Sequence, residues 1–239
     1  MKQKTVLFDL DGTLLPMDQD AFTKGYFALL VQKLAPHGYD PAALVDNIWA
    51  GTAVMVANDG TRTNEEAFWS KLVHIYGEKV RQDIPLFDAF YREEFQQAKA
   101  FCGQNPKARE VVTACKKAGY PVVLATNPIF PAVATESRIR WAGLEPEEVA
   151  LYTTYENTAY CKPNPAYYRD VAQRLGVDPA ACLMVGNDVT EDMVARTLGM
   201  RVFLLTDHII NRQNEPIDRY PHGSFPELMA YIDRAAGEE

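Results

Sequence analysis

Apolar positions along this chain follow two different patterns. Residues 6–8 form a short apolar run, typical of a buried strand, that ends in the segment Asp9–Thr13. Residues 16–100 contain no such run, and their apolar and aromatic residues recur at the spacing of helix faces. This stretch predicts four helices, near residues 19–35, from Pro41 onward, near residues 64–76 and near residues 86–100.

After residue 101, short apolar runs alternate with helical stretches. Strands are expected at residues 122–125, 182–185 and 201–205, with a weaker one near 151–153. Helices are expected at 106–118, 131–142, 165–175 and 191–198, each followed by a glycine. A polar loop over 207–223 and a helix over 225–235 complete the pattern. This alternation is typical of crossover units on a parallel sheet.

We therefore predict an α/β protein with a Rossmann-like parallel sheet, helices on both of its faces, and an inserted all-helical domain. The α/β core would comprise residues 1–15 and 101–239, and the helical domain residues 16–100. Because the insertion leaves the core directly after Asp9–Thr13, it is rooted beside whatever chemistry that segment performs.

Composition narrows the classes of function. A net charge of −8, a pI near 5.1 and the lack of any basic run argue against a nucleic-acid-binding surface. No stretch approaches the ~20 apolar residues that cross a bilayer. The chain start shows no apolar signal region, so a cytoplasmic protein is expected. The four cysteines and four histidines are scattered, which predicts free thiols and argues against a histidine-built metal site.

Asp9 and Asp11 stand two positions apart at the end of the first strand. In an extended chain such residues project to the same side, so both carboxylates would face one volume while Gly12 lets the backbone turn. A local turn, in which both carboxylates bond only nearby backbone, would produce the same pattern. The other strand ends decide between these interpretations.

Several of the other predicted strands also end in polar residues. In open parallel sheets, ligands bind beyond the carboxyl ends of the strands. Besides Asp9 and Asp11, the residues expected at that edge are Thr126, Asn127, Lys162, Gly186, Asn187, Asp188 and Asp192. Four neighbouring carboxylates repel one another unless a hard divalent cation lies among them, and oxygen ligands suit magnesium. A cation, a lysine and hydroxyl donors together form a receptor for phosphoryl oxygens.

Each of these motifs has an ordinary structural explanation when it is taken alone. Asn127 before a proline is a good turn former, and Lys162 before Pro163 is typical of a solvated loop. Asp188 and Asp192 would be stabilised by the dipole at a helix start. Their joint placement at strand ends favours the functional interpretation.

The chain resembles the haloacid dehalogenase-like hydrolase superfamily, and in particular its phosphatase branch. Asp9–Thr13 (DLDGT), Thr126-Asn127, Lys162-Pro163 and the stretch Gly186–Asp192 occur in the order of that family's four motifs. The motifs span nearly the whole chain, and the helical insertion resembles the family's cap domain between the first and second motifs. The resemblance implies a magnesium-dependent phosphoric monoester hydrolase that acts on a small phosphorylated metabolite.

The resemblance also assigns catalytic roles. Asp9 would attack phosphorus and form an aspartyl-phosphate, and Asp11 would protonate the leaving oxygen and then activate water. Thr126 would donate a hydrogen bond to a phosphoryl oxygen, and Lys162 would balance charge. Gly12 and Asn127 complete the expected set of substrate-binding residues.

Magnesium would be held by Asp9, the backbone carbonyl of Asp11 and a carboxylate after Gly186. The family usually has Asp directly after that glycine, where this chain has Asn187. We assign the ligand to Asp188 because Asn would leave the metal one negative charge short, with Asn187 as the alternative. Asp192 would orient the metal's surroundings.

The same scaffold supports other reactions. Dehalogenation needs neither a leaving-group acid nor a metal, so Asp11 and Asp188 argue against it. A phosphonate hydrolase would need a lysine reaching in from the cap, for which Lys24 is the candidate. A phosphomutase would use the same residues as the phosphatase. A non-catalytic binding module could dispense with Asp9 or Asp11, yet this chain keeps both.

The helical insertion should restrict access to small molecules. Its aromatic residues fit helical stripes and are expected as core: Phe22, Tyr26, Phe68, Trp69, Phe90 and Phe95. Asp18, Lys24 and the loop 58–63 with Arg62 are candidate substrate contacts. No membrane or nucleic-acid partner is expected, and the protein would be a monomer or homodimer.

Overall fold

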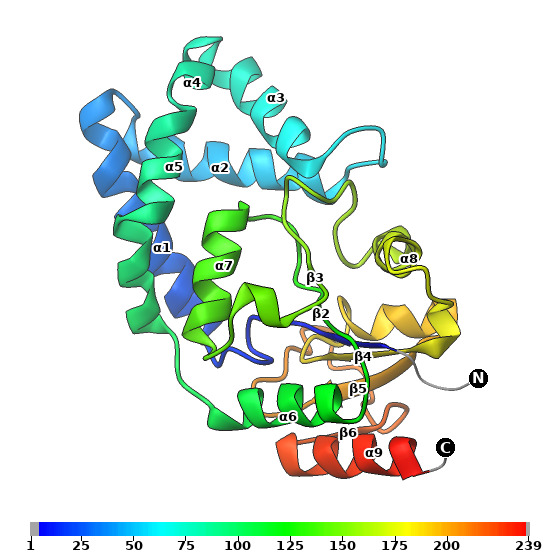
Figure 1. Ribbon diagram of the computed structural model, residues 1–239. Coiled ribbons are helices and arrows are strands. Elements are labelled where there is room, and N and C mark those ends of the chain that lie inside the picture. Colours follow the sequence, from blue (N-terminus) through cyan, green and yellow to red (C-terminus); the bar gives the residue numbers. More distant parts are fainter. Residues whose placement is uncertain (1–4, 238–239) are drawn as a thin grey trace.

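Six parallel strands form a single sheet in the computed structural model, which describes residues 5–237 (Figure 1). The strands are β1 (Thr5–Phe8), β2 (Val122–Leu124), β3 (Leu151–Tyr152), β4 (Cys182–Gly186), β5 (Arg201–Leu205) and β6 (His222–Gly223). Their spatial order is β3-β2-β1-β4-β5-β6, so the chain builds outward from β1 in both directions. The predicted α/β fold is confirmed. Residues 1–4 and 238–239, which the sequence assigns to the core, lie outside the described part.

Helices cover both faces of the sheet because successive strand residues point to opposite sides. Val6 and Phe8 of β1 belong to the cluster that includes α6 (Pro106–Lys117) and α9 (Phe225–Gly237). Leu7 belongs to a second cluster with α8 (Pro165–Arg174) and η5 (Met193–Leu198). Figure 1 shows α6 and α9 side by side beneath the sheet. The remaining elements here are α7 (Ala132–Trp141), η3 (Pro146–Glu148) and η4 (Pro179–Ala181).

Between β1 and α6 the chain forms only helices, which we call the helical insert. Its elements are α1 (Gln19–Leu34), η1 (Ala35–His37), α2 (Pro41–Val56), α3 (Asn64–Tyr76), α4 (Lys79–Gln82), α5 (Ile84–Arg92) and η2 (Glu94–Phe101). Its longer helices begin at side-chain caps: Asp18 accepts from the Ala21 backbone N–H, Asp40 caps α2, and Thr63 forms a capping box with Glu66.

Several elements differ from the sequence prediction. The expected helix over 86–100 is interrupted at Glu93, where ψ reaches −83°, and continues as the tighter helix η2. The stretch expected as a helix over 191–198 is the shorter 3₁₀ helix η5. The loop 207–223 contains the end strand β6, which its two residues were too short to indicate.

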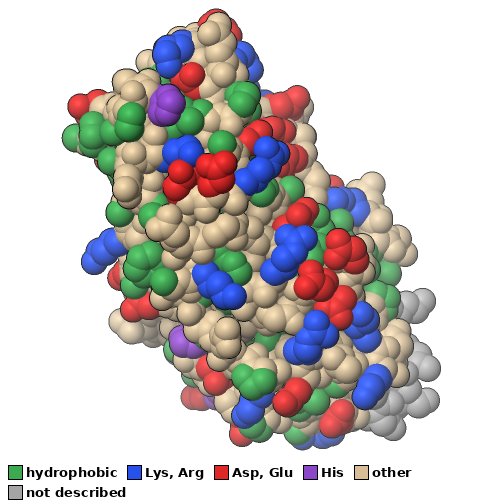
Figure 2. All heavy atoms as spheres, turned by 60° about the vertical axis from the view of Figure 1, so that its left-hand side comes forward, with side chains coloured by type: hydrophobic (Ala, Val, Ile, Leu, Met, Phe, Trp, Pro, Cys, Tyr) green, Lys and Arg blue, Asp and Glu red, His purple; other side chains and the backbone are tan. Residues whose placement is uncertain are grey.

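One hydrophobic cluster joins the insert to the α/β part. The Phe95 ring of η2 stacks on Trp141 of α7 at 5.2 Å and contacts Phe130 at 6.3 Å. In the described part the four cysteines are free, as predicted. None of the described helices combines the length and apolar character that crossing a membrane requires. Figure 2 shows acidic and basic side chains interspersed over one face.

Candidate active site

The four motifs meet at the carboxyl edge of the sheet, where the strand order reverses beside β1. Asp9 and Asp11 follow β1, Thr126 and Asn127 follow β2, and Lys162 precedes α8. After β4 come Asn187, Asp188 and Asp192. A cavity of about 400 Å³ opens there between the sheet edge and the helical insert, and all of these residues except Lys162 line it. This is the position at which open α/β sheets bind ligands.

Lys162 links the first and last motifs through two buried ion pairs. Its ammonium donates to Oδ1 of Asp9 at 2.8 Å and to Oδ1 of Asp192 at 2.7 Å. Burial disfavours its charge, but the carboxylates of Asp192 and Asp9 outweigh this, and the pKa of Lys162 is raised well above its usual value. Lys162 is therefore a permanent cation held against Asp9.

The surroundings of Asp9 disfavour its negative charge. Burial raises its pKa to about 7, Lys162 counteracts that rise, and the neighbouring Asp192 and Asp11 add to it. Its Oδ2 accepts a 3.3 Å hydrogen bond from the hydroxyl of Thr13. Additional positive charge at this edge would favour the ionised form of Asp9.

Asp192 organises the fourth motif. It is fully buried, and its Oδ2 accepts a 2.9 Å hydrogen bond from the backbone N–H of Asp188. A Cβ at Gly186 would run into the Asp192 carboxylate, so glycine is required for this close approach. Asp192 thus positions both the Lys162 ammonium and the loop that carries Asp188.

Asn187 is committed to contacts within the protein. Its Oδ1 accepts from the Thr13 hydroxyl at 3.0 Å, and its amide donates to the His208 carbonyl at 2.6 Å. Gly12 has φ +81°, and a Cβ there would collide with the Asn187 amide. Gly12 therefore lets the first motif turn against Asn187, and its role as a substrate contact stays a prediction.

Asp188 keeps one carboxylate oxygen available. Its Oδ1 accepts from the backbone N–H groups of Thr190 at 2.7 Å and Glu191 at 2.9 Å. Burial raises the pKa of Asp188, although these two bonds oppose the rise. Both Asn187 and Asp188 line the cavity, and the assignment of the metal ligand to Asp188, with Asn187 as the alternative, stays a prediction.

Thr126 and Asn127 differ in how much of their bonding capacity is free. The Thr126 carbonyl accepts from Thr153 at 2.7 Å and Tyr167 at 2.9 Å, and no described residue bonds its hydroxyl. The Asn127 amide donates to Glu191 at 3.1 Å and accepts from the backbone of Lys162 at 3.3 Å. Thr126 can therefore donate to a ligand, whereas Asn127 ties the loops of three motifs together.

The sequence interpretation did not identify Arg138. Its guanidinium is 1% exposed, forms an ion pair with Asp11 and lies 4.4 Å from the centre of the Phe130 ring. Burial raises the pKa of Asp11, and Arg138 opposes the rise. The other oxygen of Asp11, Oδ1, is buried with no partner among the described residues. A signal existed: Arg138 falls on the buried stripe of α7 with Ala134 and Trp141.

The loop 207–223 contributes to the site, which no motif indicated. Ile210 pairs with the fourth motif, because its N–H donates to the Asn187 carbonyl at 2.8 Å and its carbonyl accepts from Val189 at 3.0 Å. This pairing brings Ile210, Arg212 and Gln213 into the cavity wall.

The polar residues of the insert that were predicted as candidate substrate contacts do not line the cavity. Asp18, Lys24 and Arg62 do not line it, and Asp18 instead caps α1. Of the aromatic residues predicted as core, Phe90 and Phe95 are fully buried and away from the cavity, as expected. The others, Phe22, Tyr26, Phe68 and Trp69, are also cavity wall. These four residues are buried core residues, as predicted, and they contribute to the cavity wall as well.

The available oxygens fit a magnesium ion. One carboxylate oxygen of Asp188 and the backbone carbonyl of Asp11 accept no hydrogen bond from the residues described, and Asp9 Oδ2 accepts only the long bond from Thr13. Within residues 5–237, no group of three or more His, Cys, Asp or Glu side chains is clustered as a metal site. Magnesium needs only one or two carboxylates, completed by carbonyl, water and phosphate oxygens, so this donor set suits it.

A family model described as haloacid dehalogenase-like hydrolase matches residues 3–197. The chain belongs to the haloacid dehalogenase-like hydrolase family. The resemblance drawn from the four motifs is thereby confirmed.

Relatives of this hydrolase narrow the enzyme class. The N-acetylmuramic acid 6-phosphate phosphatase of Pseudomonas aeruginosa is 26% identical over 98% of this chain and 97% of its own. A 2-haloacid dehalogenase of Pseudomonas syringae pv. tomato has the same fold, with a TM-score of 0.65, 21% identity and coverage of 97% and 99%. A predicted phosphoglycolate phosphatase of Haemophilus somnus has a TM-score of 0.60, 18% identity and coverage of 97% and 99%. The predicted class, a phosphatase, is confirmed by the curated relatives.

Proposed function

We propose that this enzyme hydrolyses phosphate monoesters of small molecules through an aspartyl-phosphate on Asp9, with magnesium bound at the sheet edge. The observation that carries the proposal is the geometry around Asp9. A buried lysine holds one of its oxygens at 2.8 Å, and Asp11 lines the same cavity with one oxygen unpartnered. That arrangement combines a nucleophile, its counter-charge and a proton carrier.

In the first step an Asp9 oxygen forms a bond to phosphorus as the bond from phosphorus to the ester oxygen breaks. The departing oxygen takes the electron pair of the broken bond, and Asp11 in its protonated form supplies the proton. The Thr126 hydroxyl, which belongs to a cavity-lining residue, and the Lys162 ammonium, which is bonded to Asp9, would stabilise charge on the phosphoryl oxygens.

In the second step water attacks phosphorus and the Asp9 carboxylate leaves. Asp11, now ionised, takes the proton of the attacking water and is ready for another cycle. Burial raises the pKa of Asp11, which favours its protonated form, and the charges of Arg138 and Lys162 oppose the rise. Arg138 also fixes the direction of the Asp11 carboxylate through their ion pair.

Asp9, the Asp11 carbonyl and Asp188 are the proposed magnesium ligands. Acidic side chains dominate the charged part of the described cavity lining, where Asp9, Asp11, Asp88, Asp188, Glu191 and Asp192 face a single arginine, Arg212. A phosphate dianion would be repelled from such a lining, and a bound divalent cation supplies the charge that attracts it. We also propose that residues 16–100 act as a cap domain over the core formed by residues 1–15 and 101–239.

Phosphate release from a panel of monoesters tests the proposal. Wild-type protein should release phosphate with magnesium and lose activity in excess EDTA, with recovery when magnesium is restored. Asp9→Asn should lower kcat by at least about 10⁴-fold, because an amide cannot replace the nucleophile. Asp170→Asn makes the same chemical change on α8, away from the cavity, and should retain full activity. Activity retained by Asp9→Asn would disprove the covalent mechanism.

A further inference from the structure

Aromatic rings form much of the cavity wall on the side of the helical insert. On one side Phe130, Tyr26, Phe27 and Trp49 form a continuous series, with ring centres 5.5, 4.9 and 5.5 Å apart in turn. All four line the cavity. The series begins at Phe130, against the guanidinium that pairs with Asp11, and ends at the partly exposed Trp49.

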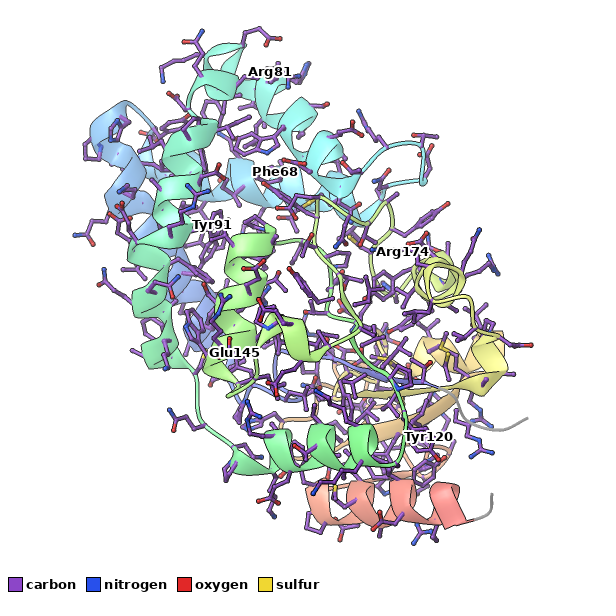
Figure 3. All side chains as sticks on the ribbon, in the orientation of Figure 1. Phe68, Arg81, Tyr91, Tyr120, Glu145 and Arg174 are labelled. Carbon is purple, nitrogen blue, oxygen red and sulfur yellow. The ribbon has the colours of Figure 1, made fainter. Side chains whose placement is uncertain are left out.

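A second series of rings faces the same space. Tyr155, Phe68, Trp69 and Phe87 follow one another with ring centres 6.3, 5.3 and 5.2 Å apart, and all of them line the cavity. Figure 3 shows Phe68 on α3 and Tyr91 on α5, two of the helices that surround this space. Mutual ring packing stiffens both series and leaves flat apolar surfaces for a ligand.

On the insert's side of the cavity the aromatic rings outnumber the other polar residues, which are Gln19, Thr23, Thr52 and Asp88. The hydroxyls of Tyr26 and Tyr91 share a 3.0 Å hydrogen bond, and the Thr52 hydroxyl donates to the Ile48 carbonyl at 3.0 Å. No lysine or arginine of the insert's described residues lines the cavity. A leaving group rich in hydroxyls would find few hydrogen-bonding partners against the two series of rings, and a carboxylate would find no cation among the insert residues that line the cavity.

We propose that the preferred substrates are phosphate monoesters whose alcohol carries an aromatic or similarly flat apolar group. This inference rests on the proposed function, which places the phosphoryl group at Asp9 and the leaving group against the insert. The cavity of about 400 Å³ is large enough for both parts. Removing one aromatic group from water favours its ester over a hydroxylated ester by at least about tenfold in kcat/KM.

The test compares esters whose leaving alcohols have similar acidity, so that the chemical step is equally difficult. 2-Phenylethyl phosphate should be hydrolysed with a kcat/KM at least about tenfold above those of glycerol 3-phosphate and ribose 5-phosphate. If the hydroxylated esters are hydrolysed as well or better, the inference is wrong while the proposed function stands. If no ester releases phosphate, the proposed function fails and the inference fails with it.

A pair of variants on α2 separates a binding ring from a structural one. Trp49→Ala should lower kcat/KM for 2-phenylethyl phosphate by about tenfold, mainly through KM, and affect glycerol 3-phosphate at most about twofold. Val56→Ala trims an exposed residue of the same helix that does not line the cavity, and should leave both substrates unchanged. An equal loss for both substrates in Trp49→Ala would overturn the inference.

Discussion

The sheet edge and the helical insert line the same cavity with different kinds of residue: mainly charged and polar side chains at the sheet edge and mainly aromatic rings on the insert. At the sheet edge, Lys162 bonds Asp9 and Asp192, and Arg138 pairs with Asp11. On the insert's side much of the surface is made of rings that pack on one another, such as Phe27 on Trp49. Buried charges demand partners in definite directions, whereas apolar contacts are non-directional. The sheet edge is therefore suited to chemistry on a constant group, and the insert to choosing what is attached to it.

Removing the charge at the centre of the sheet edge should have the largest effect on this contrast. Lys162→Met leaves Asp9 and Asp192 as buried carboxylates without their common cation. We expect kcat to fall by roughly 10²–10³-fold for aromatic and hydroxylated esters alike, because the phosphoryl group loses a stabilising charge. Steady-state kinetics with both classes of ester would measure this.

Lys24→Met provides the matched control for that variant. Lys24 is exposed on α1 and does not line the cavity, so its removal should change kcat/KM less than about twofold. A large loss of kcat/KM in Lys24→Met would support the predicted contact of this residue with the substrate. A loss in Lys162→Met restricted to one class of ester would contradict the separation of roles.

The ion pair between Arg138 and Asp11 should give an intermediate effect. Arg138→Met leaves the Asp11 carboxylate without its partner, so we expect kcat to fall by about tenfold and stability by roughly 3 kcal/mol. Arg140→Met changes an arginine of the same helix that is half exposed, and should leave both quantities almost unchanged. Chemical denaturation and kinetics together measure both effects. Unchanged kcat in Arg138→Met would show that the ion pair serves stability alone.

A small change in the wall of the insert should give the smallest effect. Gly51 lies on α2, and a Cβ at this position would come within 2.6 Å of the Phe68 ring. In Gly51→Ala the ring must shift, so we expect KM for aromatic esters to rise a few-fold at unchanged kcat. Loss of kcat instead would mean that the insert also positions the reacting groups.

The sequence allowed the sheet edge to be predicted better than the insert. Asp9, Asp188 and Asp192 follow buried strands and Lys162 precedes a helix, and the parallel order of the strands brings these residues together. Their positions could be predicted because the buried strands before them are recognisable as apolar runs in the sequence. Arg138 was missed because its partner Asp11 lies 127 residues away, and only its place on the buried stripe of α7 marks it.

The insert shows what helical periodicity leaves open. Phe22, Tyr26, Phe68 and Trp69 have the spacing of a buried face, and they are buried, yet the same rings line the cavity. Periodicity reports that a helix face avoids water and says nothing of whether protein or substrate covers it. The contribution of Ile210 was invisible for another reason, since it depends on main-chain pairing with Asn187, which any side chain can make.

The covalent intermediate on Asp9 can be tested most directly with the Asp11→Asn variant and 4-nitrophenyl phosphate. This leaving group departs without a proton, so Asp9 should still be phosphorylated, while breakdown slows because no carboxylate activates water. After circular dichroism has shown the variant to be folded, rapid mixing should give a stoichiometric burst of nitrophenolate. Acid quenching and peptide mapping should then find one phosphoryl group on Asp9. A folded variant with no burst, or with the phosphoryl group on another residue, would contradict the account.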